Sequence, residues 1–343
     1  MNYIAKNMNI GEISDSITLH GRVNFSAEDG SLHLPWSASG FSLRFKGEAV
    51  AVSFLEFLST NAPDAGEDER RLAVLLEIDG DRHKSYVSGK SAVVFADGLT
   101  SGEHTLRLLK LTESAEPLRV SEVQIYGVEP TLLSPPTVPS RRIEFIGDSI
   151  TCGYGVWGTR DGFVPFEEDP TVAYAFLTGE SLHADTRLIS WSGRGIVRAW
   201  DGGFGNRFAD FFLRSERTEG THDFSPWQPD VVVINGGTND GNSGVVSDDE
   251  FEVGVEELYR LVRSVYPRAE ILFFYGAMGL KYDAVFRRVV ARLGSEDSAL
   301  HYLATSPIVA EDGELGAIGH PSARCHLRLA AELSPAVESL LKK

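Results

Sequence analysis

Arg142-Ile-Glu-Phe-Ile-Gly-Asp-Ser149 decides how the second half of the chain folds. Its apolar residues predict a β-strand over residues 142–147, and the Gly-Asp-Ser that follows predicts a turn at the carboxyl end of that strand. Four further strands are expected at residues 186–191, 230–235, 270–275 and 300–304, and helices at residues 171–180, 248–266, 282–293 and 322–341. The segment 230–235 is almost wholly apolar, as in a strand covered on both faces. This alternation predicts a parallel sheet with helices on both faces over residues 141–343.

The first half of the chain follows a different pattern, with short strand-like segments separated by turn signals and no convincing helical period. The segments are residues 41–46, 49–55, 72–78, 91–95, 104–109 and 120–126. Many short strands at this spacing predict a β-sandwich of jelly-roll type over residues 1–128. Residues 129–140 contain four prolines, which cannot continue a helix or sit inside a sheet, so we expect an interdomain linker there.

Composition narrows the classes of function. The 343 residues fit two domains, and the formal charge of −17 disfavours binding to nucleic acid or to an anionic membrane. Two cysteines, Cys152 and Cys325, match neither a disulfide framework nor a zinc motif, and no metal site is predicted. No signal peptide or membrane span is visible, which predicts a cytoplasmic protein, or a secreted one if a signal sequence has been removed. The oligomeric state is left open.

The predicted strands direct polar groups to one edge of the sheet, because ligands of open α/β sheets lie beyond the carboxyl ends of the strands. Ser149 follows the first strand, Gly193 follows the second, and Asn239 follows the third. His320 precedes the last helix. A serine hydroxyl needs a base within hydrogen-bonding distance, and an imidazole can take and return its proton. We therefore expect Ser149 as nucleophile and His320 as base. The oxyanion donors would be the backbone N–H groups of Ser149 and Gly193 and the amide of Asn239.

These blocks together resemble the SGNH (GDSL-type) serine hydrolases. The whole chain is more similar still to the family 2 carbohydrate esterases, through residues 20–22, 34–40, 145–155, 192–196 and 319–321. The resemblance implies a jelly roll followed by a flavodoxin-like SGNH domain. It also implies an acetyl xylan esterase-like enzyme that removes O-acetyl groups from xylan- or mannan-type polysaccharides or oligosaccharides, with an acetylated saccharide as substrate and no cofactor. Thr151 stands where a Gly-x-Ser-x-Gly motif would have its second glycine, which disfavours the ordinary α/β-hydrolase fold.

One position departs from the pattern of these hydrolases, which usually carry an aspartate shortly before the histidine. Ile318 stands two residues before His320 and cannot orient the imidazole electrostatically. Some family 2 esterases use a Ser–His dyad in which a backbone carbonyl holds the ring, and we expect the same from a carbonyl near residue 318. A carboxylate of Glu311, Asp312 or Glu314 is the alternative.

Other residues near these blocks have a functional and a structural interpretation. Tyr154, Trp157, Trp191 and Trp200 are candidates for stacking on a sugar, against packing in the core or in loops. Asn239 could instead cap the helix after the third strand, and Asp240 is interpreted as structural. Two other functions stay open: an SGNH lipase or thioesterase with a different acyl substrate, and a carbohydrate-binding protein without turnover.

Overall fold

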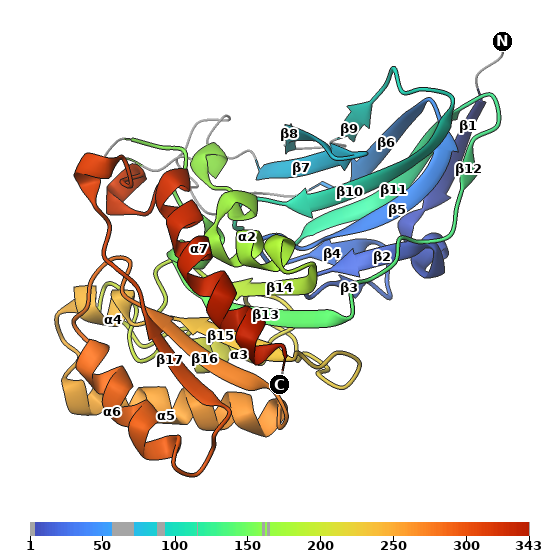
Figure 1. Cartoon of the computed structure of the whole chain (residues 1–343). Coiled ribbons are helices and arrows are strands. Elements are labelled where there is room, and N and C mark those ends of the chain that lie inside the picture. Colours follow the sequence, from blue (N-terminus) through green and yellow to red (C-terminus); the bar gives the residue numbers. More distant parts are fainter. Residues whose placement is uncertain are drawn as a thin grey trace. The chain divides into compact units, whose positions relative to one another are not determined.

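The computed structural model describes residues 4–56, 72–87, 93–114, 116–159, 162 and 165–342 (Figure 1). The chain divides into two compact units. Unit 1 comprises residues 1–138 together with 215–218, and unit 2 comprises residues 139–214 and 219–343. None of the helices in the described part of the chain is both long and apolar enough to cross a bilayer.

Unit 1 is a β-sandwich of two antiparallel sheets, as the short strand-like segments predict. One sheet has the order β3-β4-β11-β6-β9 with β1 paired to β11, and the other has the order β12-β5-β10-β7-β8 with β2 paired to β5. The strands are β1 Ile4–Asn9, β2 Ile17–His20, β3 Asn24–Phe25, β4 Leu32–Leu34, β5 Gly40–Gly47, β6 Ala49–Phe54, β7 Leu72–Ile78, β8 Asp81–Val87, β9 Val93–Ala96, β10 Gly102–Lys110, β11 Leu118–Gly127 and β12 Thr131–Leu132. Residues 91 and 92 of one predicted strand lie outside the described residues. Apolar side chains of both sheets form one core.

The predicted linker over residues 129–140 is partly a strand. Thr131 and Leu132 pair with β5, and Leu133 donates its backbone N–H to the carbonyl of Arg44 at 2.9 Å. These residues stand between prolines and keep their N–H groups, so they can extend the edge of a sheet although the prolines cannot. Residues 215–218, which follow α3 in the sequence, also belong to unit 1.

Unit 2 is a parallel five-stranded sheet with the order β14-β13-β15-β16-β17, which is the flavodoxin-like order. Its strands are β13 Arg141–Gly147, β14 Ala184–Ser190, β15 Val231–Asn235, β16 Glu270–Tyr275 and β17 Leu300–Ala304. Its helices are α1 Ser149–Cys152, α2 Tyr174–Ser181, α3 Phe208–Phe212, α4 Thr238–Ser243, α5 Asp248–Val265, α6 Asp283–Leu293 and α7 Ala323–Leu340. Helices α2 and α7 lie on one face of the sheet, and α5 and α6 lie on the other (Figure 1).

The register of the three central strands fixes where their loops begin. Gly147 at the end of β13 is level with Ser190 of β14 and with Asn235 of β15. The loops that carry Ser149, Gly193 and Asn239 therefore leave the sheet from the same height. This register produces the convergence of polar groups that the sequence predicts.

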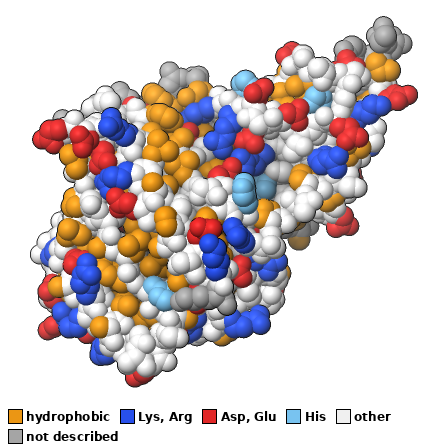
Figure 2. Space-filling view, viewed as in Figure 1, with side chains coloured by type: hydrophobic (Ala, Val, Ile, Leu, Met, Phe, Trp, Pro, Cys, Tyr) orange, Lys and Arg blue, Asp and Glu red, His pale blue; other side chains and the backbone are white. Residues whose placement is uncertain are grey.

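Charged side chains of both signs are interspersed on the face shown in Figure 2. No single block of acidic side chains covers this face. Interspersed charges of both signs are typical of a surface that keeps a protein dispersed in water.

His326 connects helices α2 and α7 inside unit 2. Its side chain is fully buried, and its Nδ1 accepts the backbone N–H of Tyr174, the first residue of α2, at 3.2 Å. Burial, and to a smaller extent electrostatic repulsion from the nearby His320 imidazole, lower the pKa of His326 to about 3. The ring therefore stays neutral in the folded protein at pH values where the unfolded chain takes up a proton.

Stability should fall as the pH drops from about 6.5 toward 3, because only the unfolded state then protonates this imidazole. In His326→Gln the amide oxygen can still accept the Tyr174 N–H but does not titrate. We expect the variant to lose less unfolding free energy between pH 7 and pH 5, by up to about 1.4 kcal/mol per pH unit below 6.5. Urea unfolding followed by tryptophan fluorescence measures this, and equal pH slopes for both proteins would contradict it.

Candidate active site

A cavity of about 540 Å³ lies at the carboxyl edge of the parallel sheet in unit 2. Its walls come from the loops after β13, β14, β15 and β16 and from the segment before α7. The lining residues are Ser149, Tyr154, Ser192, Gly193, Trp200, Thr238, Asn239, Asn242, Met278, Ile318 and His320. The four predicted catalytic and oxyanion residues are thus brought together in one cavity.

The turn after β13 holds Ser149 at the start of the four-residue helix α1. Asp148 caps this helix by accepting the N–H of Ile150 at 3.0 Å. Serine often caps helices, but here Asp148 does so and Ser149 is the first residue of the helix. Residue 147 must be glycine, because a Cβ there would lie 2.0 Å from Oγ1 of Thr151. Ser149 is 5% exposed and lines the cavity, and its hydroxyl does not serve as the helix cap.

His320 connects the serine to a main-chain carbonyl. Its Nε2 lies 2.9 Å from Oγ of Ser149, and its Nδ1 lies 3.1 Å from the carbonyl oxygen of Ile318. A carbonyl oxygen can only accept, which assigns the ring proton to Nδ1 and leaves Nε2 to accept the serine hydroxyl. The carbonyl predicted near residue 318 therefore contacts the ring.

The alternative carboxylates are placed differently. Both oxygens of Glu314 bind the Arg328 guanidinium, at 2.6 and 2.8 Å, and one of them also accepts the N–H of Val309. The Arg328 guanidinium holds the pKa of Glu314 down at about 2. Glu311 and Asp312 are exposed to solvent. Glu314 is thus committed to Arg328.

Ile318 has an unusual backbone conformation, with φ 50° and ψ 40° in the left-handed region. A β-branched residue is rare there, because its side chain crowds the following carbonyl at a cost of about 1–2 kcal/mol. Gly319 follows with φ 69°, so two consecutive residues are left-handed. This turn directs the Ile318 carbonyl to His320, and sequence periodicity contains no signal for it.

The oxyanion candidates lie on two neighbouring loops. Gly193 has φ 77°, and a Cβ there would lie 2.9 Å from the indole of Trp200. The amide nitrogen of Asn239 donates to the carbonyl of Arg194 at 2.8 Å and to Oδ2 of Asp148 at 3.2 Å. Both of its hydrogens therefore have partners, and an oxyanion would compete with the longer bond to Asp148. The oxyanion role of Asn239 stays a prediction.

The four candidate aromatic residues separate into two pairs. Tyr154 and Trp200 line the cavity, and the Tyr154 ring lies 4.7 Å from the His320 ring between centroids. Trp157 and Trp191 are not among the lining residues. The Trp157 indole N–H donates to Asp169 at 3.3 Å, and Trp191 packs against the Arg194 guanidinium at 4.7 Å. The contact with Arg194 makes packing the better interpretation of Trp191, whereas Trp157 is 54% exposed but does not line this cavity.

Sequence reasoning missed Asn242 and Met278, which also line the cavity. Met278 lies in the loop after β16, so the rule applied to the first three strands would have found it if extended to the fourth. Asn242 lies one turn beyond Asn239 in α4, and no pattern singles it out.

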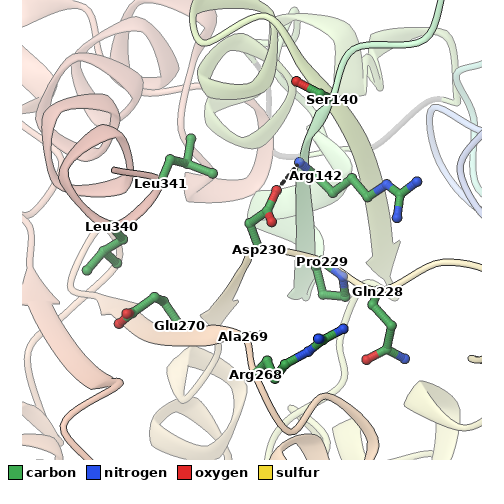
Figure 3. A pocket seen from close by; sticks show the side chains of 10 residues that line it. All are labelled: Ser140, Arg142, Gln228, Pro229, Asp230, Arg268, Ala269, Glu270, Leu340 and Leu341. Atoms are coloured by element: carbon green, nitrogen blue, oxygen red, sulfur yellow. Dashed lines mark hydrogen bonds between the residues drawn. The ribbon is translucent and has the colours of Figure 1, made fainter. Parts of the chain in front are cut away.

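A second cavity, of about 330 Å³, lies at the opposite edge of the same sheet (Figure 3). There Asp230 accepts the backbone N–H of Arg142 at 2.8 Å. Its ten lining residues include no histidine or cysteine, so they lack the imidazole that the carboxyl edge has in His320.

Comparison with known proteins agrees with this geometry. Residues 145–327, more than half of the chain, match the GDSL-like lipase/acylhydrolase family. The chain belongs to that family. Residues 19–136 match the carbohydrate esterase 2 N-terminal domain. As the sequence motifs imply, this GDSL-like chain resembles the family 2 carbohydrate esterases.

Its relatives are esterases by name. The chain is 31% identical over 345 positions to the cellulase/esterase CelE of Acetivibrio thermocellus, covering 96% of this chain and 40% of that protein. It is 25% identical over 265 positions to an acetylxylan esterase / glucomannan deacetylase of Cellvibrio japonicus, covering 70% and 68%. A family two carbohydrate esterase from Clostridium thermocellum, solved in complex with cellohexaose, has a TM-score of 0.84 at 29% identity, covering 95% of this chain and 99% of that one. The chain thus spans less than half of CelE.

The left-handed backbone of residue 318 predicts a difference between two truncations. Ile318→Gly and Ile318→Ala remove nearly the same side chain, but only alanine keeps a Cβ in the disfavoured conformation. We expect Ile318→Gly to be more stable than Ile318→Ala by about 1 kcal/mol. Urea unfolding of both variants measures the difference, and a more stable alanine variant would show that the left-handed turn is absent in solution.

Proposed function

We propose that this protein is a carbohydrate O-acetylesterase that removes acetyl groups from plant polysaccharides or their oligosaccharides, of the xylan or mannan type. The observation that carries the proposal is the hydrogen bond between Ser149 Oγ and His320 Nε2, inside a cavity that also contains the oxyanion candidates. The activities for which the relatives are named support the substrate class.

In the first half of the reaction, Ser149 Oγ attacks the acetyl carbonyl carbon while His320 Nε2 takes the hydroxyl proton. The negative charge that develops on the carbonyl oxygen would be met by the N–H groups of Ser149 and Gly193 and by the Asn239 amide. When the tetrahedral intermediate collapses, the ester C–O bond breaks and Nε2 returns the proton to the leaving sugar oxygen. An acetyl group then remains on Ser149.

In the second half, water attacks the acetyl-enzyme and His320 takes one of its protons. The bond to Ser149 Oγ breaks, the proton goes to that oxygen, and acetic acid leaves and ionises to acetate in water. Throughout both halves, Nδ1–H stays on the Ile318 carbonyl, which holds the ring in its orientation. A carbonyl supplies this orientation without the full negative charge of the carboxylate found in a triad.

Replacement of either dyad residue should abolish turnover. We expect Ser149→Ala and His320→Ala each to lower kcat for p-nitrophenyl acetate and acetylated xylan by at least about 10³-fold, and the double variant to be no worse than either single one, since the two act as a unit. Ser264→Ala, on helix α5, is the matched control and should retain wild-type rates. Acetate release is the measurement.

The same assay separates the competing functions. Absence of acyl release from any ester by the wild type would favour a binding protein and contradict the proposal. A preference for long acyl chains over acetyl would favour a lipase-like enzyme.

Trp200 should contribute to saccharide binding. It is 64% exposed and lines the cavity beside Gly193, whereas Trp157 is 54% exposed and lies outside the lining. We expect Trp200→Ala to raise KM for acetylated oligosaccharides about tenfold, as loss of one stacking contact implies, and Trp157→Ala to raise it less than twofold. Initial-rate kinetics test the pair, and equal effects of the two variants would remove Trp200 from the binding surface.

A further inference from the structure

The carboxylate of Asp240 holds three consecutive backbone N–H groups of the loop after β14. Its Oδ2 accepts from Ile196 at 2.9 Å, and its Oδ1 accepts from Val197 at 2.7 Å and from Arg198 at 2.8 Å. The side chain is fully buried. Burial raises the pKa of Asp240, and the three donors oppose that shift because they favour the ionised form. Consecutive backbone N–H groups that surround one anion form strong, directional hydrogen bonds to it.

Gly195 is the residue that lets the loop come this close. A Cβ at position 195 would lie 1.9 Å from the carbonyl oxygen of Arg198 and 2.6 Å from Oδ2 of Asp240. Neither a backbone oxygen nor a clamped carboxylate can move aside cheaply. Glycine at position 195 is thus explained by the close approach of the Arg198 carbonyl and the Asp240 carboxylate.

Residues 196–198, which donate to Asp240, lie between two candidate substrate contacts in the sequence. Gly193 precedes them and Trp200 follows them, and the two are joined by the bond from the Trp200 N–H to the Gly193 carbonyl at 3.0 Å. Arg198 also extends its guanidinium to Glu250 at 2.9 Å, which ties the loop to helix α5. The position of Gly193 and of Trp200 therefore depends on how the segment between them is held.

Asp240 directly follows Asn239 in helix α4, so the two side chains hold the same loop from adjacent positions. The Asn239 amide donates to the carbonyl of Arg194, and the Asp240 carboxylate accepts the N–H groups of residues 196–198. The two proposed oxyanion donors on different loops, the Gly193 N–H and the Asn239 amide, are spaced relative to each other through these contacts.

We propose that Asp240 is a positioning residue for the oxyanion hole, acting through the loop that carries Gly193 and Trp200. This inference rests on the proposed esterase function. An oxyanion donor stabilises the transition state more than the bound ester, so displacement of the loop should lower kcat and leave KM for a small ester nearly unchanged.

The test compares Asp240→Asn with Asp297→Asn in the full chain. The first substitution preserves shape but replaces one acceptor oxygen with an NH₂ group that cannot accept a loop N–H. Asp297 is the matched control, because it accepts the N–H of Ala299 and the Tyr259 hydroxyl and pairs with Arg263, away from the cavity lining.

We expect Asp240→Asn to lower kcat for p-nitrophenyl acetate about 30- to 100-fold, below the full loss of one oxyanion donor, with KM changed less than threefold. Amide hydrogen exchange of residues 192–200 should accelerate in the same variant. Asp297→Asn should lower the melting temperature but keep kcat within twofold and leave exchange of 192–200 unchanged. Equal kcat losses in the two variants, or unchanged exchange in Asp240→Asn, would overturn the inference.

A measurement on the wild type keeps the inference testable if Asp240→Asn fails to fold. Among residues 192–203, the amides of residues 196–198 should exchange most slowly. Exchange there as fast as at the exposed Asp201 would show that these amides are not held by Asp240 in solution. Hydrolysis by the wild type together with an unaffected Asp240→Asn variant would contradict only this inference. No hydrolysis of any ester by the wild type would contradict the proposed function, while the exchange data would still report on the hydrogen bonds to Asp240.

Discussion

The hydrogen bond between Ser149 and His320 joins two residues 171 positions apart, and the parallel sheet of unit 2 is what allows it. The level ends of β13, β14 and β15 start the loops that carry Ser149, Gly193 and Asn239 from one height. Helix α7 begins at Ala323, three residues after His320, and the Ile318 carbonyl holds the imidazole on the side away from Ser149. A change in strand register would therefore move the proposed nucleophile, both oxyanion loops and the base relative to one another.

A neutral main-chain carbonyl, and not a charged carboxylate, orients the His320 ring. A carbonyl in the position usual for a carboxylate can hold the proton on Nδ1, and so keeps Nε2 ready to accept the serine proton. The left-handed backbone at Ile318 that directs this carbonyl is energetically unfavourable, and the surrounding turn has to maintain it. Asp240 is a comparable case on the oxyanion side, where a buried charge is tolerated because three N–H groups surround it.

Much of this arrangement could be predicted from the sequence, because hydrophobic period and motif order are local signals. The strands of unit 2 and their loops follow from apolar runs that end in glycine-rich turns, as at Gly147. Long-range contacts that no sequence motif marks could not be predicted. The pairing of Thr131 with β5 and the hydrogen bonds from residues 196–198 to Asp240 both require partners far away in the chain.

Covalent trapping tests the central claim, that Ser149 is a nucleophile activated by His320, most directly. The intact protein would be treated with a fluorophosphonate, digested and analysed by mass spectrometry. The account predicts a single adduct on Ser149, formed at least about 100-fold more slowly in His320→Ala, the range expected for loss of a general base. An adduct on another serine, or an unchanged labelling rate in His320→Ala, would contradict it.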